Sequence, residues 1–486
     1  MKKLTKKSSI TFVELPPTQF GTLNGPLGYD IYSQSKSPSR AIPTLRGVLV
    51  EEGYTNTREI NPYYHGEKGK LTHKNMKDIF ESDALLISSI TRTSPQSMKL
   101  AEIYKLNNPA GIVIAGGPDP TFRTAEWLKY VDLVVRGEGE KTLKELMQRL
   151  IGDPSQLNDI HGLAYTLNKD FQINAPRNLL TEKELGELPH PFYDPDVIRH
   201  LLTGTIETTR GCPYNCDFCS VTEMYGNRYR RRPLKWTLEE MLRISKYGKY
   251  TFIVDDNLAT GGPKDIERLE AIAKIDGKRK NKTAQITVHA AKNDELLEAM
   301  RKAGIESLCI GVESISNETL KGLGKLTTAE LNKYAVPKFR KAGFFVHGMM
   351  MLGGDGDTIE SLRETEEWAN ENLDSVQYFA PVPIPGTKFR QQMKEEGRIF
   401  TEDWFLYDAQ SVLIRPKNIS PYDLQMKITK MYESFYSYKN TLKRLKKSQH
   451  KKMSIAITLW AKNFGLKNVL FDPQSKAHLE FLKSIS

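Results

Sequence analysis

Three of the four cysteines in this chain lie on one short stretch: Cys212, Cys216 and Cys219, with the spacing C-x3-C-x2-C. They follow a run rich in β-branched residues, 205–209, which predicts a loop at the end of a strand. Thiolates this close together can bind one soft metal centre. Three ligands fit a [4Fe–4S] cluster in which one iron has no protein ligand, so that iron can bind a substrate or cofactor.

A closed zinc site is one alternative, and it needs a fourth cysteine or histidine. None follows within thirty residues, so His200 upstream or the distant Cys309 would have to complete it. A reduced trio without metal is the other alternative. With Phe218 before the third cysteine, the stretch resembles the C-x3-C-aromatic-C signature of the radical S-adenosylmethionine (SAM) superfamily. The resemblance implies a cluster on the three cysteines, SAM on the open iron, and Phe218 in the cofactor site.

Length and composition predict a soluble protein of several domains. The chain has 486 residues, more than one core usually holds, with 39% hydrophobic and 27% charged residues. No apolar run reaches the roughly 18 residues that span a bilayer, and the apolar stretch near the N-terminus is too short for a signal peptide. We therefore expect a cytoplasmic protein, where thiolates stay reduced. The net charge of +11 is moderate, and no nucleic-acid partner is expected.

Residues 1–150 alternate between short apolar runs and stretches of helical periodicity, which predicts a doubly wound parallel sheet. The expected strands include 10–13, 84–88, 111–115 and 132–135. Ligands of such sheets bind beyond the carboxyl ends of the strands. Glycine lets the backbone approach a bulky ligand there. The glycines and hydroxyls at these ends are Ser88, Ser89, Gly116, Gly117, Gly137 and Gly139.

This first domain resembles the cobalamin-binding domain that precedes many radical SAM domains. The matching features are the hydroxyl-rich end of the third strand, the GGP turn at 116–118 and the RGEGE turn at 136–140. The loop at 15–32 has no histidine, unlike the classical motif D-x-H-x-x-G, so a corrin would lack a histidine ligand from this loop. A domain that binds no corrin and acts as a scaffold or substrate platform is the alternative. The residues that the resemblance assigns to cobalamin are Ser88, Ser89, Thr91, Gly116, Gly117, Gly137, Glu138 and Gly139.

Strand and helix patterns start again after a proline-rich stretch, so we predict a linker over 151–203 and a second domain over 204–395. Six strand–helix units match the partial (β/α)6 barrel of radical SAM enzymes. Chemistry in barrels gathers at the C-terminal ends of the strands. The resemblance implies that Asp255, Asp256 and Asn257 hold the SAM ammonium, although the commonest family form is GGE, and that Glu313 accepts from the ribose hydroxyls.

Acidic and amide residues near expected helix starts are interpreted as caps. Asn293 or Asp294 is predicted to cap the helix that follows the third strand of the second domain. Asp357 is predicted to cap a later helix.

Residues 396–486 predict a helical extension with a basic run at 439–452 and an apolar stretch at 453–470. The basic run is either a solvated face or a site for an anionic partner such as a membrane surface. The apolar stretch either packs into the core or forms an interfacial helix that contacts lipid.

The resemblance implies a cobalamin-dependent radical SAM enzyme that cleaves SAM reductively and methylates an unactivated carbon, with a lipid or isoprenoid-derived compound as the leading substrate class. It also implies a reducing partner such as a flavodoxin or ferredoxin. No single catalytic side chain is identified. The alternatives are radical chemistry without a corrin, C–C bond or ring formation, and a non-catalytic iron–sulfur protein.

Overall fold

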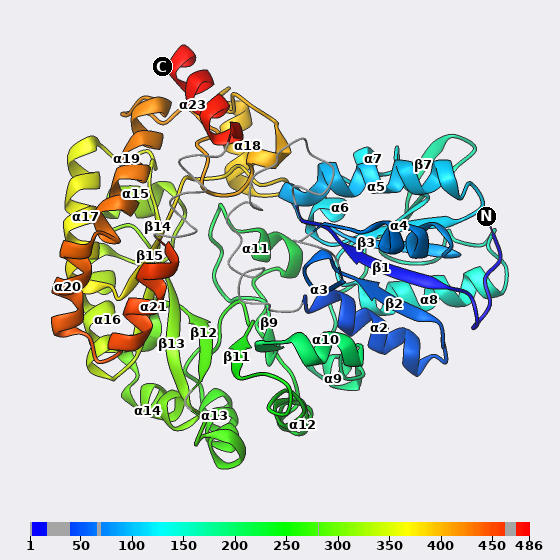
Figure 1. The fold of residues 1–486 in the computed structure, drawn as a ribbon, viewed down its shortest axis with the longest axis horizontal. Helices are drawn as coiled ribbons and strands as arrows, with labels where there is room; N and C mark the ends of the chain where they lie inside the picture. Colours follow the sequence, from blue (N-terminus) through cyan, green and yellow to red (C-terminus); the bar gives the residue numbers. More distant parts are fainter. Residues whose placement is uncertain (1, 17–38, 66–69, 280, 462–472) are drawn as a thin grey trace. The chain divides into compact units, whose positions relative to one another are not determined.

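The computed structural model describes residues 2–16, 39–65, 70–279, 281–461 and 473–486. The described residues form two compact units (Figure 1). The first unit extends to Thr205 and includes Arg231–Pro233. The second contains Ile206–Arg230 and the chain from Leu234 onward.

A seven-stranded sheet in the order β2-β1-β3-β4-β5-β6-β7 forms the centre of the first unit. Strands β1 to β5 pair in parallel, and the apolar residues of β1, β3 and β4 alternate between two apolar clusters, one on each face. Such burial on both faces explains their continuous apolar sequences. The bounds are β1 Ile10–Glu14, β2 Thr57–Ile60, β3 Ala84–Ser88, β4 Ile112–Gly116 and β5 Leu133–Val135, with helices α2 Ala41–Glu51, α3 Pro62–His65, α4 His73–Phe80, α5 Ser94–Asn107, α6 Pro118–Phe122, α7 Thr124–Trp127 and α8 Gly139–Ile151.

The stretch 151–203, predicted as a linker, contains two strands that continue this sheet. Strands β6 (Leu163–Leu167) and β7 (Asp170–Ile173) form an antiparallel hairpin, and β6 pairs with β5. The two turn residues, Asn168 and Lys169, both have positive φ, as a type I′ turn requires. The sequence Asn-Lys lacks the glycine that usually marks such a turn, so the sequence pattern does not reveal the hairpin. Helices α9 (Glu182–Glu187) and α10 (Pro195–His200) follow.

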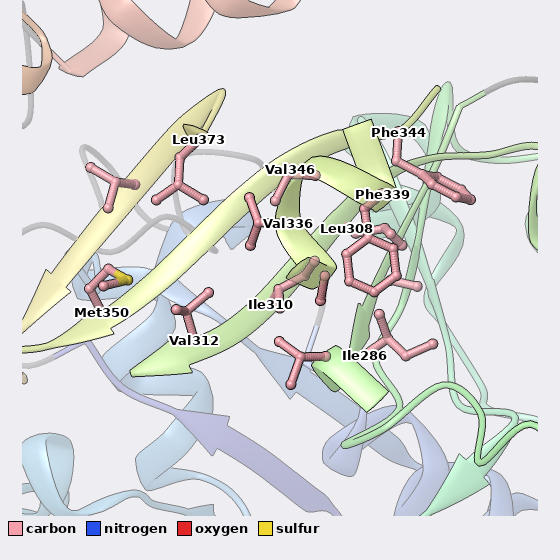
Figure 2. Close-up of a cluster of buried hydrophobic side chains, with 14 of the residues drawn as sticks. Ile286, Leu308, Ile310, Val312, Val336, Phe339, Phe344, Val346, Met350 and Leu373 are labelled. Atoms are coloured by element: carbon pink, nitrogen blue, oxygen red, sulfur yellow. The ribbon is translucent and has the colours of Figure 1, made fainter. Parts of the chain in front are cut away.

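The second unit is built on a six-stranded sheet in the order β15-β14-β13-β12-β11-β8, in which β11 to β15 pair in parallel. Apolar residues on alternate positions of β12 to β14 pack against the covering helices (Figure 2). The bounds are β8 Thr203–Ile206, β11 Tyr250–Ile253, β12 Lys282–Ile286, β13 Ile305–Glu313, β14 Phe345–Met351 and β15 Ser375–Phe379, with helices α12 Leu234–Ile244, α13 Pro263–Asp276, α14 Asp294–Lys302, α15 Asn317–Gly322, α16 Ala329–Lys341, α17 Ile359–Asn372 and α18 Lys388–Glu395. The predicted fold, a doubly wound sheet followed by a partial barrel, is confirmed.

Side-chain caps at two helix starts in this unit test the sequence-based expectations. Asn293 caps α14, in agreement with the prediction, by accepting a hydrogen bond from the Leu296 backbone N–H. The prediction for Asp357 is wrong, because Thr358 caps α17. The Asp357 carboxylate instead accepts from the backbone N–H groups of Gly353 and Gly354, at 2.8 and 3.0 Å, and so fixes the loop after β14.

The C-terminal region is helical, as predicted, with α19 Pro421–Phe435, α20 Tyr438–Lys447, α21 Lys451–Trp460 and α23 Pro473–Ile485. The predicted apolar stretch 453–470 lies only in part within the described residues. Among the helices that the structure describes, none is both long and apolar enough to cross a membrane.

Candidate functional site

The three cysteines lie on one loop between β9 (Thr209–Arg210) and α11 (Ser220–Tyr225). All three are half-buried free thiols, and the Cys219 N–H donates to the Cys216 carbonyl at 3.1 Å. Burial raises the pKa of each thiol, that of Cys219 to about 11. Thiolates are stable in such a place only beside positive charge, which a metal centre supplies. The loop therefore fits an iron–sulfur cluster.

Cys309, the fourth cysteine, lies in the middle of strand β13, where it pairs with Gln285 on β12 and His347 on β14. Burial raises its pKa to about 12. Nothing in this strand position resembles the cysteine loop, and within the described residues no group of three or more His, Cys, Asp or Glu is arranged to hold a single metal ion.

The triplet 255–257, which follows β11, forms hydrogen bonds with the backbone that leads into the cysteine loop. Asp255 is fully buried and accepts from the backbone N–H groups of Thr208 and Thr209, at 2.6 and 3.0 Å. Asp256 accepts from the N–H of Gly211 at 2.9 Å. Burial raises the pKa of each carboxyl group to about 6. These hydrogen bonds fix the strand end from which the cysteines project.

The hydrogen bonds also distinguish the three members of the triplet. Asn257 is fully buried, donates to the Ala259 carbonyl at 3.0 Å and accepts from the Thr287 N–H at 3.2 Å. Asp255 and Asn257 are thus fully buried and bonded to nearby backbone, whereas Asp256 is half-buried and bonded to the backbone of the cysteine loop at Gly211. Their predicted contact with the SAM ammonium stays a prediction, and the geometry favours Asp256 for it.

Glu313 ends strand β13 at a register shift and has a positive φ of 60°. Its Oε1 lies 2.9 Å from Nζ of Lys325, and both side chains are largely buried. Burial alone would lower the pKa of Lys325, but attraction to Glu313 and to Cys216 outweighs it, and the net shift is upward. A non-glycine residue at positive φ is uncommon and is maintained by its surroundings. This charged pair is therefore a fixed feature beside the cysteine loop.

Lys325 is a site residue that the sequence did not reveal. It lies in the loop between α15 and α16, without a motif around it, and its Nζ is 5.9 Å from the ring centroid of Phe218. The preceding Gly324 has φ +60°, and a Cβ there would overlap the Asp217 carboxylate. Gly324 is the one sequence feature that could have indicated this contact, since a glycine allows the loop of Lys325 to pack directly on the cysteine loop.

Phe218 itself anchors the cysteine loop by apolar packing. It contacts a small buried cluster that includes Phe389 and Met393 of α18. The backbone N–H of Phe389 donates to the Asp217 carbonyl at 2.9 Å. The structure thus gives Phe218 a positioning role, and its predicted contact with a cofactor stays a prediction.

In the first unit, the predicted residues lie at the C-terminal ends of β3, β4 and β5, as expected. Ser88 ends β3 and is half-buried, and Ser89 and Thr91 follow it in buried positions. The hydroxyl of Ser89 lies 3.1 Å from that of Thr93. The Glu138 side chain binds the backbone of a later segment, because its Oε2 accepts a hydrogen bond from the Leu180 N–H at 2.7 Å. Its side chain therefore supports the chain that follows the sheet.

The loop at 15–32, predicted to offer no histidine to a corrin, lies outside the described residues except for its first two. That expectation therefore stays a prediction.

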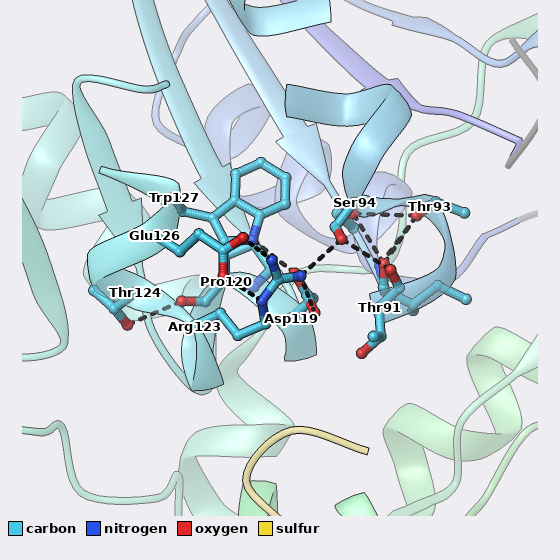
Figure 3. Close-up of polar contacts among 11 residues, drawn as sticks. Thr91, Thr93, Ser94, Asp119, Pro120, Arg123, Thr124, Glu126 and Trp127 are labelled. Atoms are coloured by element: carbon cyan, nitrogen blue, oxygen red, sulfur yellow. Dashed lines mark hydrogen bonds and ion pairs between the residues drawn. The ribbon is translucent and has the colours of Figure 1, made fainter. Parts of the chain in front are cut away.

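A buried polar network fixes the turn after β4 (Figure 3). Arg123 donates to Ser94 at 2.9 Å and to Asp119 at 3.1 Å, and the indole N–H of Trp127 donates to Asp119 at 2.7 Å. Asp119 is fully buried, so these bonds compensate its charge. The network joins α6 and α7 to the start of α5 and holds the glycine turn in place. No sequence motif indicates it.

Gly117 follows β4 and Gly137 follows β5, at the edge of the sheet formed by the C-terminal ends of its parallel strands. Both glycines have positive φ, but their surroundings differ. Gly117 has φ +104°, and a Cβ there would lie 2.7 Å from the Ser89 carbonyl oxygen. Gly137 has φ +71°, and a Cβ there would meet no atom of the described residues within 4 Å. Open space above a glycine backbone is what a bulky ligand such as a corrin requires. The edge therefore fits cobalamin at Gly137.

Gly117→Ala is expected to destabilise the first unit by about 3 kcal/mol or more, because backbone strain and overlap with Ser89 add together. Gly137→Ala is the matched control, with backbone strain alone, and should cost about 1–2 kcal/mol. Urea unfolding followed by circular dichroism measures both. Equal losses would contradict the close packing of Gly117 on Ser89.

Two family models match this chain. The model described as the radical SAM superfamily matches residues 206–369, and the one described as the B12 binding domain matches residues 76–147. The cysteine loop, Asp256 and Glu313 fall inside the first match, and the glycine turns inside the second.

Curated relatives cover most of the chain at moderate identity. An uncharacterized methyltransferase of Pyrococcus horikoshii is 29% identical over 87% of this chain and 91% of its own. The bacteriochlorophyllide d C-12(1)-methyltransferase of Chlorobaculum tepidum is 26% identical over 76% of this chain and 78% of its own. The hopanoid C-3 methylase of Methylococcus capsulatus is 28% identical over 66% of this chain and 62% of its own.

Among solved structures, the cobalamin-dependent radical enzyme OxsB, with aqua-cobalamin and SAM bound, has the same fold. The TM-score is 0.70 at 17% sequence identity, over 99% of this chain and 75% of that one.

Proposed function

Because this chain belongs to the radical SAM enzymes that carry a B12-binding domain, we propose that it methylates an unactivated carbon of a lipid-type substrate. Enzymes of this family act on small molecules and need an electron donor. When bound, the [4Fe–4S] cluster, SAM and cobalamin supply reductive SAM cleavage and a transferable methyl group. The observation that carries the proposal is the cysteine loop beside the Glu313–Lys325 pair, at the carboxyl ends of the barrel strands.

Each residue near the cysteine loop has a task in this proposal. Cys212, Cys216 and Cys219 hold the cluster. Lys325 is a cation beside the cysteine loop, so it suits the carboxylate of SAM, and Asp256 accepts from the loop backbone at Gly211, so it suits the ammonium. Glu313 keeps Lys325 in place and offers its remaining acceptor capacity to hydroxyls.

In the first unit, cobalamin is assigned to the edge formed by the ends of β3, β4 and β5. Gly137 brings backbone close to a flat ligand, Gly116 ends β4 and Ser88 supplies a hydroxyl at the same edge, and Gly117 lets the turn pack on Ser89. Ser89, Thr91 and Glu138 stabilise the edge through hydrogen bonds and burial, and Gly139 starts α8. The chain residues thus bind and orient the corrin.

The substrate class and the location of the enzyme complete the proposal. The hopanoid-methylating relative supports a lipid or isoprenoid-derived substrate. Buried thiols that must stay reduced suit the cytoplasm, and a flavodoxin or ferredoxin suits the role of electron donor. Peripheral contact with a membrane would bring such an enzyme to its substrate.

The test uses SAM with a deuterated methyl group. The reconstituted full chain is incubated anaerobically with reductant and either a hopanoid or bacteriochlorophyllide d, and products are analysed by mass spectrometry. Transfer of label to a carbon of the hopanoid is expected. Label on bacteriochlorophyllide alone would contradict the lipid assignment. SAM cleavage without label in any product would contradict methylation.

A further inference from the structure

Four large apolar side chains of helices α20 and α21 face outward. Tyr438 and Leu442 of α20 are 67% and 61% exposed, and Ile455 and Leu459 of α21 are 43% and 48% exposed. Each pair is four residues apart, so it lies on one face of its helix. The two helices contact each other and together form the α20–α21 hairpin (Figure 1). In a water-soluble helix pair, such residues normally form the buried seam.

The buried face of the hairpin is polar instead. Thr441 and Thr458 face each other with their hydroxyls 3.4 Å apart, and Ser448 and Ser454 do the same at 3.4 Å. Arg444 is buried, donates to the Phe435 carbonyl at 2.6 Å and lies over the Phe435 ring. The fully buried positions of the hairpin thus hold small hydroxyl side chains and one arginine, while Ile457 packs half-buried against the core. The exposed apolar residues lie outside that seam.

Six lysines accompany the exposed apolar residues, and all are exposed. On α20, Lys439, Lys443 and Lys447 are spaced four residues apart and form a row next to Tyr438 and Leu442. No ion pair joins any of the six to an acidic side chain of the described residues, and no acidic residue occurs in the segment 439–452. The six are Lys439, Lys443, Lys446, Lys447, Lys451 and Lys452.

We propose that the α20–α21 hairpin docks this enzyme on an anionic membrane surface. Outward apolar side chains would enter the interface between headgroups and acyl chains, while the surrounding lysines bind anionic headgroups. A nucleic acid would use the lysines but not the exposed Leu442, Ile455 and Leu459. The inference rests on the proposed function in one respect, since a lipid-type substrate would be met at the bilayer.

Vesicle flotation of the full chain tests the docking. Binding to vesicles of phosphatidylcholine with about one third phosphatidylglycerol is expected, with much weaker binding to phosphatidylcholine alone and a decrease as salt rises. The triple variant Lys439→Gln/Lys443→Gln/Lys447→Gln should bind about a hundredfold more weakly. The triple variant Leu442→Ser/Ile455→Ser/Leu459→Ser should bind at least about tenfold more weakly at every salt concentration.

Matched variants elsewhere control for net charge and for apolar exposure. Lys74→Gln/Lys235→Gln/Lys264→Gln removes three exposed lysines from other helices and should bind as the unmodified protein does. The apolar control replaces by serine three other residues that are each at least half exposed, Leu106, Leu167 and Ile173. Equal losses in control and hairpin variants would overturn the proposal, as would absence of binding to anionic vesicles. A dimer in light scattering that the hairpin serine variant dissociates would assign the surface to a second copy and overturn it too.

Failure of docking and failure of the proposed function are separable. Label transfer to a hopanoid presented in detergent, with no vesicle binding, would overturn the docking alone. Vesicle binding without label transfer would overturn the methylation alone.

Discussion

Cys216→Ala is expected to lose its cluster iron and at least about a thousandfold in the rate of reductive SAM cleavage. The three cysteines of this loop are the assigned protein ligands of the cluster, so Cys216→Ala leaves it with two. Iron and sulfide analysis and the visible spectrum of the anaerobically reconstituted protein measure the first effect. Formation of 5′-deoxyadenosine measures the second.

The fourth cysteine provides the control. Cys309→Ala changes a thiol in the middle of β13 and should keep the full iron content. Loss of iron in Cys309→Ala equal to that in Cys216→Ala would contradict the assignment of the cluster to the loop. A normal cluster in Cys216→Ala would contradict it as well.

Lys325→Ala is expected to weaken SAM binding about a hundredfold and to destabilise the second unit by about 3 kcal/mol or more. The change removes the cation beside the cysteine loop and leaves Glu313, only 6% exposed, as a buried charge without its lysine. Equilibrium dialysis of SAM against the cluster-loaded protein measures binding. Urea unfolding measures stability.

A double variant separates binding from stability. Glu313→Gln with Lys325→Met removes both charges and keeps the side-chain volumes, so most of the lost stability should return. SAM binding should stay weak, because the cation is still absent. Recovery of SAM binding together with stability would show that the pair is only structural.

The fold was predictable because its signals are local. Strands β1, β3, β4 and β5 are buried on both faces and therefore read as continuous apolar runs, and the glycine turns follow β4 and β5 directly in the sequence. The cysteine loop was predictable for a similar reason, since its three ligands lie within eight residues.

What the sequence did not reveal depends on contacts between distant segments. Lys325 reaches the cysteine loop only through the packing of Gly324 on Asp217, more than a hundred residues away. Arg123 acquires its role from the buried partners Ser94 and Asp119. Asp255 and Asn257 look like ligands in the sequence, because their backbone partners become visible only in three dimensions.

The most direct test of cobalamin-dependent methylation is the metal content of the full chain after anaerobic reconstitution with iron, sulfide and hydroxocobalamin and gel filtration. We expect a full cluster and near-stoichiometric cobalt in the protein peak, with a visible spectrum that shows no histidine ligation of the corrin. A peak with iron but no cobalt would contradict a methyl transfer that depends on cobalamin.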